Sequence, residues 1–319
     1  MTAPPIAVVT NIFRPLSTPA ESIAALSWLV VGVCLAIFLV VAGLLAYTVV
    51  RFRRPAVDLD REPAQVYGSS QIEIAWTVIP ILIVIVLTMA TARVITEVQD
   101  RPRPEDALTV RVIGHQWWWE IRYPSLGVVT ANELHIPVST SSNQRPTFLQ
   151  LDSVDVAHSF WVPQLAGKTD LIPNHPNWMW IEPKVEGTYI GNCAEFCGLQ
   201  HANMLIRVVV ESEDAFSQWI AHQKTNPPAG QPGEKLFLGL SCVNCHTVAG
   251  TSAKGTFGPD LTHLMSRQTL GSGVMSNTSD NLRHWIRDPQ TVKPGNLMPN
   301  MQLSDREVDQ VRDYLMTLE

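Results

Sequence analysis

The sequence is poor in cysteine, poor in charge and has no basic excess. Its 319 residues include five cysteines, too few for a disulfide scaffold. Charged residues make up 16% of the chain, and the net charge is −6, with the acidic excess concentrated in residues 105–226. This charge argues against nucleic acid as a partner and suits a basic protein partner. The sequence shows no internal repeat, so repeat architectures are not indicated.

Long uncharged runs are present near the N-terminus. Ile23 to Val50 and Ile74 to Ala92 are each long enough to cross a bilayer as a helix. Pro80 lies in the second run and is tolerated in membrane helices. A cleaved signal peptide is the alternative for the first run, but the run is too long and no basic stretch precedes it. We therefore predict a two-helix transmembrane hairpin, with helices over about 23–50 and 74–95, in an N-terminal segment 1–104.

The segment between these two runs is rich in arginine. It contains Arg51, Arg53, Arg54 and Arg61. Because loops that stay in the cytoplasm carry an excess of basic residues, we expect this loop on the cytoplasmic side and both termini on the outer side.

The pattern changes after residue 104. Short runs rich in Val, Ile, Thr and Trp alternate with Gly, Pro, Asn and Ser, which predicts an all-β sandwich over 105–223. The expected strands include Leu108–Ile113, Trp117–Arg122, Thr147–Asp152, Trp178–Ile181 and Leu205–Val210. Residues 224–233 have the composition of a linker. Residues 234–319 are helical in pattern, and Ser304 with Glu307 forms a capping-box signature before a terminal helix.

The densest group of potential metal ligands lies in residues 191–204. Cys193, Cys197, His201 and Met204 supply two thiolates, an imidazole and a thioether, a set that selects copper. His158 lies in another expected strand and offers a second imidazole. The two cysteines are too close for separate metals, and both sulfurs can bridge two ions. A disulfide or a zinc site is the alternative, but neither gives Met204 a role.

These residues resemble subunit II of haem–copper cytochrome c oxidases, over about residues 20–215. The resemblance implies a cupredoxin sandwich of Greek-key topology that holds a dinuclear copper centre (CuA). It implies the following ligands: Cys193 and Cys197 as bridges, His158 and His201 as terminal ligands, and Met204 and the main-chain carbonyl of Glu195 as weak ligands. The Glu195 side chain is further expected to bind a magnesium ion shared with subunit I.

Two more residues acquire roles from this resemblance. Trp117, in the aromatic segment 114–119, matches the position where electrons enter from a docked cytochrome. Glu73 matches a glutamate at the entrance of a proton channel of subunit I. Packing in the core is the alternative for these tryptophans, and a charge at the end of a helix is the alternative for Glu73.

Residues 242–246 read CVNCH, the c-type haem attachment motif. Cys242 and Cys245 would form the thioether links, and His246 would bind the iron. Residues 233–319 are similar to class I cytochromes c, in which the carbonyl at Pro259 supports the histidine and a methionine is the sixth ligand. Met298 is the predicted ligand because it precedes a proline, and Met301 is the alternative; methionine opposite histidine raises the haem potential.

The expected chain is a multidomain protein with a membrane hairpin, a cupredoxin domain and an all-α class I cytochrome c domain. Such fusions resemble the caa-type oxidases of bacteria. The resemblance implies a chain of the bacterial plasma membrane with both soluble domains on the periplasmic or extracellular side. An external donor, such as a cytochrome c or an upstream respiratory complex, would supply electrons.

The same resemblance implies that electrons pass through haem c and CuA to subunit I, where oxygen is reduced and protons are pumped. This chain carries no catalytic residue for oxygen reduction by itself. Two alternatives remain at this point: a nitric oxide or nitrous oxide reductase, and a membrane-anchored carrier with no attached enzyme.

Overall fold

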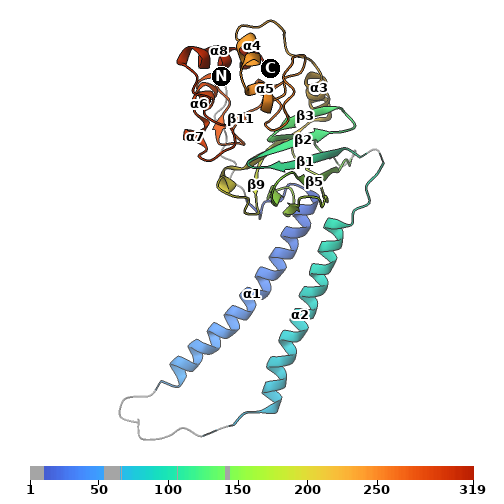
Figure 1. Ribbon diagram of the computed structural model, residues 1–319. Helices are drawn as coiled ribbons and strands as arrows, with labels where there is room; N and C mark the ends of the chain where they lie inside the picture. The colour runs from blue at the N-terminus through green and yellow to red at the C-terminus, as the bar shows by residue number, and fades with distance from the viewer. Residues whose placement is uncertain (1–10, 54–64, 66, 106, 141–143) are drawn as a thin grey trace. The chain divides into compact units, whose positions relative to one another are not determined.

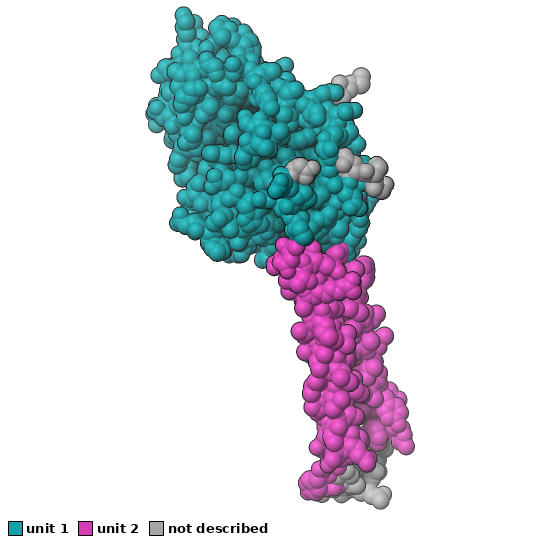
Figure 2. Space-filling model, turned by 90° about the vertical axis from the view of Figure 1, so that its right-hand side faces the viewer, with its two compact units in different colours: residues 1–21, 101–319 teal, residues 22–100 magenta. Residues whose placement is uncertain are grey.

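The computed structural model describes residues 11–53, 65, 67–105, 107–140 and 144–319. These residues form two compact units, residues 1–21 with 101–319 and residues 22–100 (Figure 2). The expected loop residues Arg54 and Arg61 lie outside the described residues.

Two long helices form most of the second unit (Figure 1). Helix α1 spans Thr18–Arg51 and helix α2 spans Ser70–Gln99, and both are long and apolar enough to cross a membrane. Both helices extend beyond the uncharged runs of the sequence. Backbone hydrogen bonds continue through the flanking polar residues, because a helix does not have to end where its apolar segment ends.

Two five-stranded sheets form the sandwich that was expected from the sequence. The first sheet has the order β3-β2-β1-β5-β8. Its strands are β1 (Thr109–His115), β2 (Trp118–Tyr123), β3 (Val128–Ala131), β5 (Thr147–Ser153) and β8 (Asn177–Ile181). Strands β1 and β5, which are distant in sequence, lie side by side as a parallel pair.

The second sheet has the order β4-β10-β9-β6-β7. Its strands are β4 (Glu133–Pro137), β6 (His158–Trp161), β7 (Thr169–Leu171), β9 (Gly187–Cys193) and β10 (Leu205–Glu211). One apolar core lies within the sandwich, with Trp119, Tyr123 and Phe160 among its largest fully buried side chains. Helix α3 (Glu213–Gln223) follows β10 and adds Phe216 and Ile220 to this core.

The C-terminal part is mainly helical and has its own apolar core. Its elements are α4 (Glu234–Gly239), α5 (Cys242–Cys245), η3 (Leu264–Ser266), β11 (Thr269–Leu270), β12 (Met275–Ser276), α6 (Ser279–Arg287), α7 (Pro289–Val292) and α8 (Asp305–Leu315). The predicted capping box is confirmed at α8, where Ser304 accepts a hydrogen bond from the Glu307 backbone and the Glu307 carboxylate accepts one from the Ser304 backbone. Val308, Val311 and Leu315 then face the core at helical spacing.

Candidate copper and haem sites

Strand register brings the predicted copper ligands together. In the ladder between β6 and β9, Phe160 pairs with Cys193, which places His158 near the end of β9. In the ladder between β9 and β10, Leu205 pairs with Asn192, so Met204 lies opposite Cys193, and the Cys193 N–H donates to the Met204 carbonyl. The intervening segment, which includes η2 (His201–Asn203), must fold back over these strand ends.

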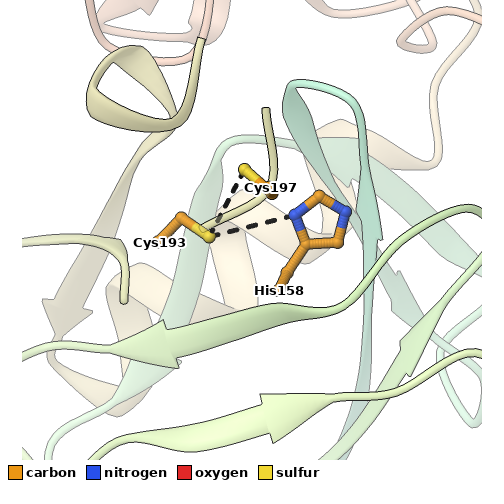
Figure 3. A group of neighbouring side chains, drawn as sticks. All are labelled: His158, Cys193 and Cys197. Carbon is orange, nitrogen blue, oxygen red and sulfur yellow. Dashed lines mark hydrogen bonds between the residues drawn. The ribbon is translucent and has the colours of Figure 1, made fainter. Parts of the chain in front are cut away.

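The sulfur atoms of Cys193 and Cys197 and the His158 ring lie close together (Figure 3). Cys193 Sγ lies 3.7 Å from Cys197 Sγ and 3.9 Å from His158 Nδ1. Cys197 Sγ lies 3.7 Å from His201 Nδ1 and 3.9 Å from Met204 Sδ. The Glu195 carbonyl oxygen lies 3.1 Å from Cys193 Sγ. All six predicted ligands are therefore brought together, with four of them around the two sulfurs. The donor set is one that suits copper.

Hydrogen bonding shifts the pKa values of Cys193 and Cys197 in opposite directions. The hydrogen bond between the two sulfurs, together with one involving His158, lowers the pKa of Cys193 despite burial. The hydrogen bond to Cys193 and burial raise the pKa of Cys197. The thiolate form is thus favoured at Cys193 and the thiol form at Cys197, and binding of cations to both sulfurs would require loss of their protons.

An acidic residue that sequence reasoning missed orients His158. Asp155 Oδ1 lies 2.8 Å from His158 Nε2, which leaves Nδ1 directed at Cys193. A carboxylate behind a ligating histidine fixes its tautomer. Burial would raise the pKa of Asp155, but the hydrogen bonds with His158 and with backbone N–H groups outweigh it, so the pKa is lowered.

A glycine makes room for the same imidazole. A Cβ atom on Gly114 would lie 2.6 Å from His158 Cδ2, closer than side chains pack. The position three residues before Trp117 therefore has to be glycine for His158 to keep this orientation.

The haem motif lies at the wall of a cavity in the C-terminal domain. The cavity is lined by Cys242, Cys245, His246, Met298 and Met301, and also by Trp117 and Trp118 of the sandwich. His246 Nδ1 donates to the Pro259 carbonyl oxygen at 2.7 Å, which leaves Nε2 free to bind a metal. A Cβ atom on Gly258 would lie 2.6 Å from His246 Cε1, so only glycine fits at that position.

The cavity fits a group that carries a carboxylate. Arg267 is buried, lines the cavity and donates from Nη2 to the Asp260 carbonyl at 2.5 Å. Among the described residues, its Nε atom is one of a few buried polar atoms without a hydrogen-bond partner. A haem propionate would supply the acceptor that this guanidinium lacks.

The two candidate sixth ligands both lie at this cavity. The Met298 N–H donates to Asn296 Oδ1 at 2.8 Å, and its carbonyl accepts from Gln290 Nε2 at 2.7 Å. These bonds hold the main chain around Met298 in place. The choice of Met298 over Met301 stays a prediction.

Three further residues were predicted to have a function: Trp117, Glu195 through its side chain, and Glu73. Trp117 is 8% exposed, and its Nε1 donates to the Cys197 carbonyl at 2.9 Å. The Glu195 side chain is exposed at the copper loop. Glu73 lies in the first turn of α2. His115, which sequence reasoning assigned to structure, lies 2.9 Å from Glu120 and stacks on Trp118.

The fold and these two sites define a membrane-anchored electron-transfer protein. Three family models match along the chain: the transmembrane domain of cytochrome c oxidase subunit II over residues 8–94, its periplasmic domain over 108–212, and cytochrome c over 230–319.

Curated relatives cover most of the chain. Cytochrome c oxidase subunit 2 of Alkalihalophilus pseudofirmus is 34% identical over 291 residues, 88% of this chain and 82% of the relative. The same subunit of Bacillus subtilis is 33% identical, over 85% of this chain and 81% of the relative. The crystal structure of the periplasmic domain of subunit II of cytochrome oxidase from Bradyrhizobium japonicum is also similar, at 28% identity. That match covers 39% of this chain and 96% of that chain, with a TM-score of 0.35.

The chain belongs to the cytochrome c oxidase subunit II family, in a form with a fused cytochrome c domain. Its copper-site and cytochrome c domains imply copper and haem c as cofactors, and subunit I and other oxidase subunits as partners. Membership of this family argues against the two alternatives, a nitric oxide or nitrous oxide reductase and a membrane-anchored carrier with no attached enzyme.

Proposed function

We propose that this chain binds two copper ions and one covalent haem c and carries electrons to subunit I. The convergence of four further donor atoms on the Cys193 and Cys197 sulfurs supports this proposal most strongly. When bound, the copper pair and the haem each accept and release one electron at a time.

The copper ligands act through fixed geometry. The two thiolates would bridge both ions, which shares one electron between them. His158 and His201 would each bind one ion through Nδ1, with Met204 and the Glu195 carbonyl as weak ligands. Strands β6 and β9 hold His158 and Cys193, and the other ligands lie in the short segment between β9 and β10. Because both ends of this segment are anchored in one sheet, the ligands would move little between redox states, and small reorganisation favours fast electron transfer.

The cytochrome domain would hold haem c by thioether links from Cys242 and Cys245. His246, oriented by Pro259, would bind one side of the iron, and Met298 the other. Arg267 would donate to a propionate. Methionine opposite histidine favours the reduced state and raises the potential.

The proposed order of transfer is external donor, cytochrome domain, copper domain and subunit I. Trp117 would receive the electron from the cytochrome domain, because its ring lines the cavity of that domain and its Nε1 contacts the Cys197 carbonyl. We propose a cytochrome c or an upstream respiratory complex as the donor.

The remaining assignments follow the family. Both soluble domains would lie on the periplasmic or extracellular side of the bacterial plasma membrane. The exposed Glu195 carboxylate would bind magnesium at the contact with subunit I, and Glu73 would lie at the entrance of a proton channel. Oxygen reduction and proton pumping would take place in subunit I.

Analysis of the solubilised native complex tests this function. We expect two coppers in this chain for each haem c, and co-purification with a large multi-helix subunit that contains a haem–copper centre. Isolation of the chain as a single subunit that carries only haem would contradict the proposal.

A further inference from the structure

Two buried charged side chains join the cytochrome domain to the copper domain. Glu133, the first residue of β4, is 1% exposed. Its carboxylate accepts hydrogen bonds from the backbone N–H groups of Gln268 and Thr269, at 2.9 to 3.0 Å, and from Thr269 Oγ1 at 2.9 Å. All of these donors belong to the cytochrome domain.

Arg207 reinforces this contact. It pairs with Glu133 in the ladder between β4 and β10, and its Nη1 donates to Thr269 Oγ1 at 3.0 Å. Thr269 thus accepts from the arginine and donates to the glutamate. This geometry gives the β11 segment one specific position on the copper domain.

Lys293 is the second buried charge, and it comes from the cytochrome domain. It follows α7, is 2% exposed, and its Nζ donates to three main-chain carbonyls. The acceptors are Trp117 at 2.8 Å, Asn203 at 2.7 Å and Gly271 at 3.0 Å. Burial lowers the pKa of Lys293 to about 7, and its protonated form has three N–H bonds, one for each of these carbonyls.

Two of these acceptors flank the copper ligands. Trp117 donates to the Cys197 carbonyl, and Asn203 directly precedes Met204. Lys293 also lines the cavity that contains His246 and Met298. One side chain therefore touches the boundary of both candidate cofactor sites.

Around these two charges, further hydrogen bonds join the cytochrome domain to the copper domain. The described residues form two separate apolar cores, one for each domain. Leu205 and Ser272 exchange two hydrogen bonds, and Gln200 Nε2 donates to the Pro294 carbonyl at 2.5 Å. Buried charges that are fully hydrogen-bonded add little net affinity, but they penalise other orientations because each alternative leaves them unpaired.

We propose that Lys293 and Glu133 are positioning residues that hold the cytochrome domain in one register over Trp117, which reserves this tryptophan for electrons from the chain's own cytochrome domain. This inference rests on the electron-transfer function proposed above. The transfer oxidises the cytochrome domain by one electron and reduces the copper domain by one, without a bond change or proton. An external donor then has to deliver its electron to the cytochrome domain, because Trp117 is covered.

Hydrogen exchange on the full-length chain in detergent tests the docking without relying on turnover. Lys293→Met leaves three carbonyls without their donor, and Glu133→Gln places an amide N–H₂ against donors from Gln268 and Thr269. We expect amide exchange at Thr269 and Leu205 to accelerate at least about tenfold in both variants, which corresponds to about 1.4 kcal/mol. Lys235→Met and Glu186→Gln, at exposed positions, are the matched controls and should leave exchange unchanged.

A second measurement follows electron redistribution between the domains after a light pulse reduces one of them. We expect at least about a tenfold slower rate in Lys293→Met and Glu133→Gln, with the haem and copper spectra unchanged. Thr269→Val conserves volume and removes only the hydroxyl, so it gives a smaller change in the same direction if the other variants misfold. Lys293→Arg, which keeps the charge, should recover part of the rate.

The outcomes separate this inference from the function on which it rests. Absence of copper or haem from the unmodified chain overturns the function. Normal cofactor spectra with unchanged exchange and unchanged redistribution in Lys293→Met, Glu133→Gln and Thr269→Val overturn only the positioning roles.

Discussion

The copper domain and the cytochrome domain prepare their sites in different ways. In the copper domain, the pairing of β9 with β6 and β10 brings His158 and Met204 to the end of β9, where Cys193 lies beside a continuous apolar core. In the cytochrome domain, the motif residues surround a cavity that the side chains do not fill. The comparison indicates that copper would bind at a preformed site, whereas haem would complete the core of its domain.

Removal of the haem attachment gives the largest expected effect. The double variant Cys242→Ala, Cys245→Ala should lose covalent haem absorbance completely. Because haem would fill the cavity, we expect the unfolding temperature of the cytochrome domain to fall by more than about 10 °C, or about 2 kcal/mol. Calorimetry on the full chain measures it. Cys34→Ser, at an exposed position in α1, is the control.

Removal of one bridging sulfur should affect chemistry more than stability. Cys193→Ser should abolish copper binding, because a hydroxyl is a far poorer bridge than a thiolate. The unfolding temperature of the metal-free copper domain should change by less than about 5 °C, which corresponds to about 1 kcal/mol. Unfolding of the metal-free domain in this variant would show that its site is not preformed. It would contradict the difference that we infer between the two domains.

The axial methionine is a smaller, spectroscopic test. Met298→Ala should remove the sulfur-to-iron charge-transfer band at the red end of the spectrum and lower the haem potential. Met301→Ala should keep the band. The physical reason is that Pro299 restricts the main chain at Met298, which favours an extended segment that presents the sulfur. Loss of the band only in Met301→Ala would reverse the assignment.

A surface ion pair gives the smallest expected effect. The hydrogen bond from Arg283 lowers the pKa of Asp309 and links α6 to α8 in the cytochrome domain. A carboxylate with a lowered folded-state pKa contributes stability above its unfolded pKa, near 3.8, and loses it as the pH falls through the folded value. Asp309→Asn should therefore lower the unfolding temperature slightly at pH 7 and have no effect near pH 2. Thermal scans at the two pH values measure the difference, and equal shifts would contradict the ion pair.

Local patterns predicted much of the fold and the site. The sequence predicted the hairpin, five of the strands and the capped terminal helix, because each depends on the periodicity of one short segment. Most copper ligands were readable for a related reason: Cys193, Cys197, His201 and Met204 are close in sequence. Asp155 could also have been found, as a carboxylate three residues before a candidate histidine ligand.

The contacts between the domains could not be predicted in this way. Glu133 meets Thr269, and Lys293 meets Trp117, across more than a hundred residues of sequence. In the sequence both look like ordinary surface charges, because burial of a single charge leaves no periodic signal. Arg267 was missed for the same reason, since only the folded cavity shows that its Nε atom lacks a partner.

Electron spin resonance of the purified, oxidised full-length chain tests the central claim most directly. If Cys193 and Cys197 bridge two coppers, one unpaired electron is shared by two equivalent nuclei, and the account predicts a seven-line hyperfine pattern with two coppers per chain. A four-line pattern with one copper per chain would contradict the dinuclear centre.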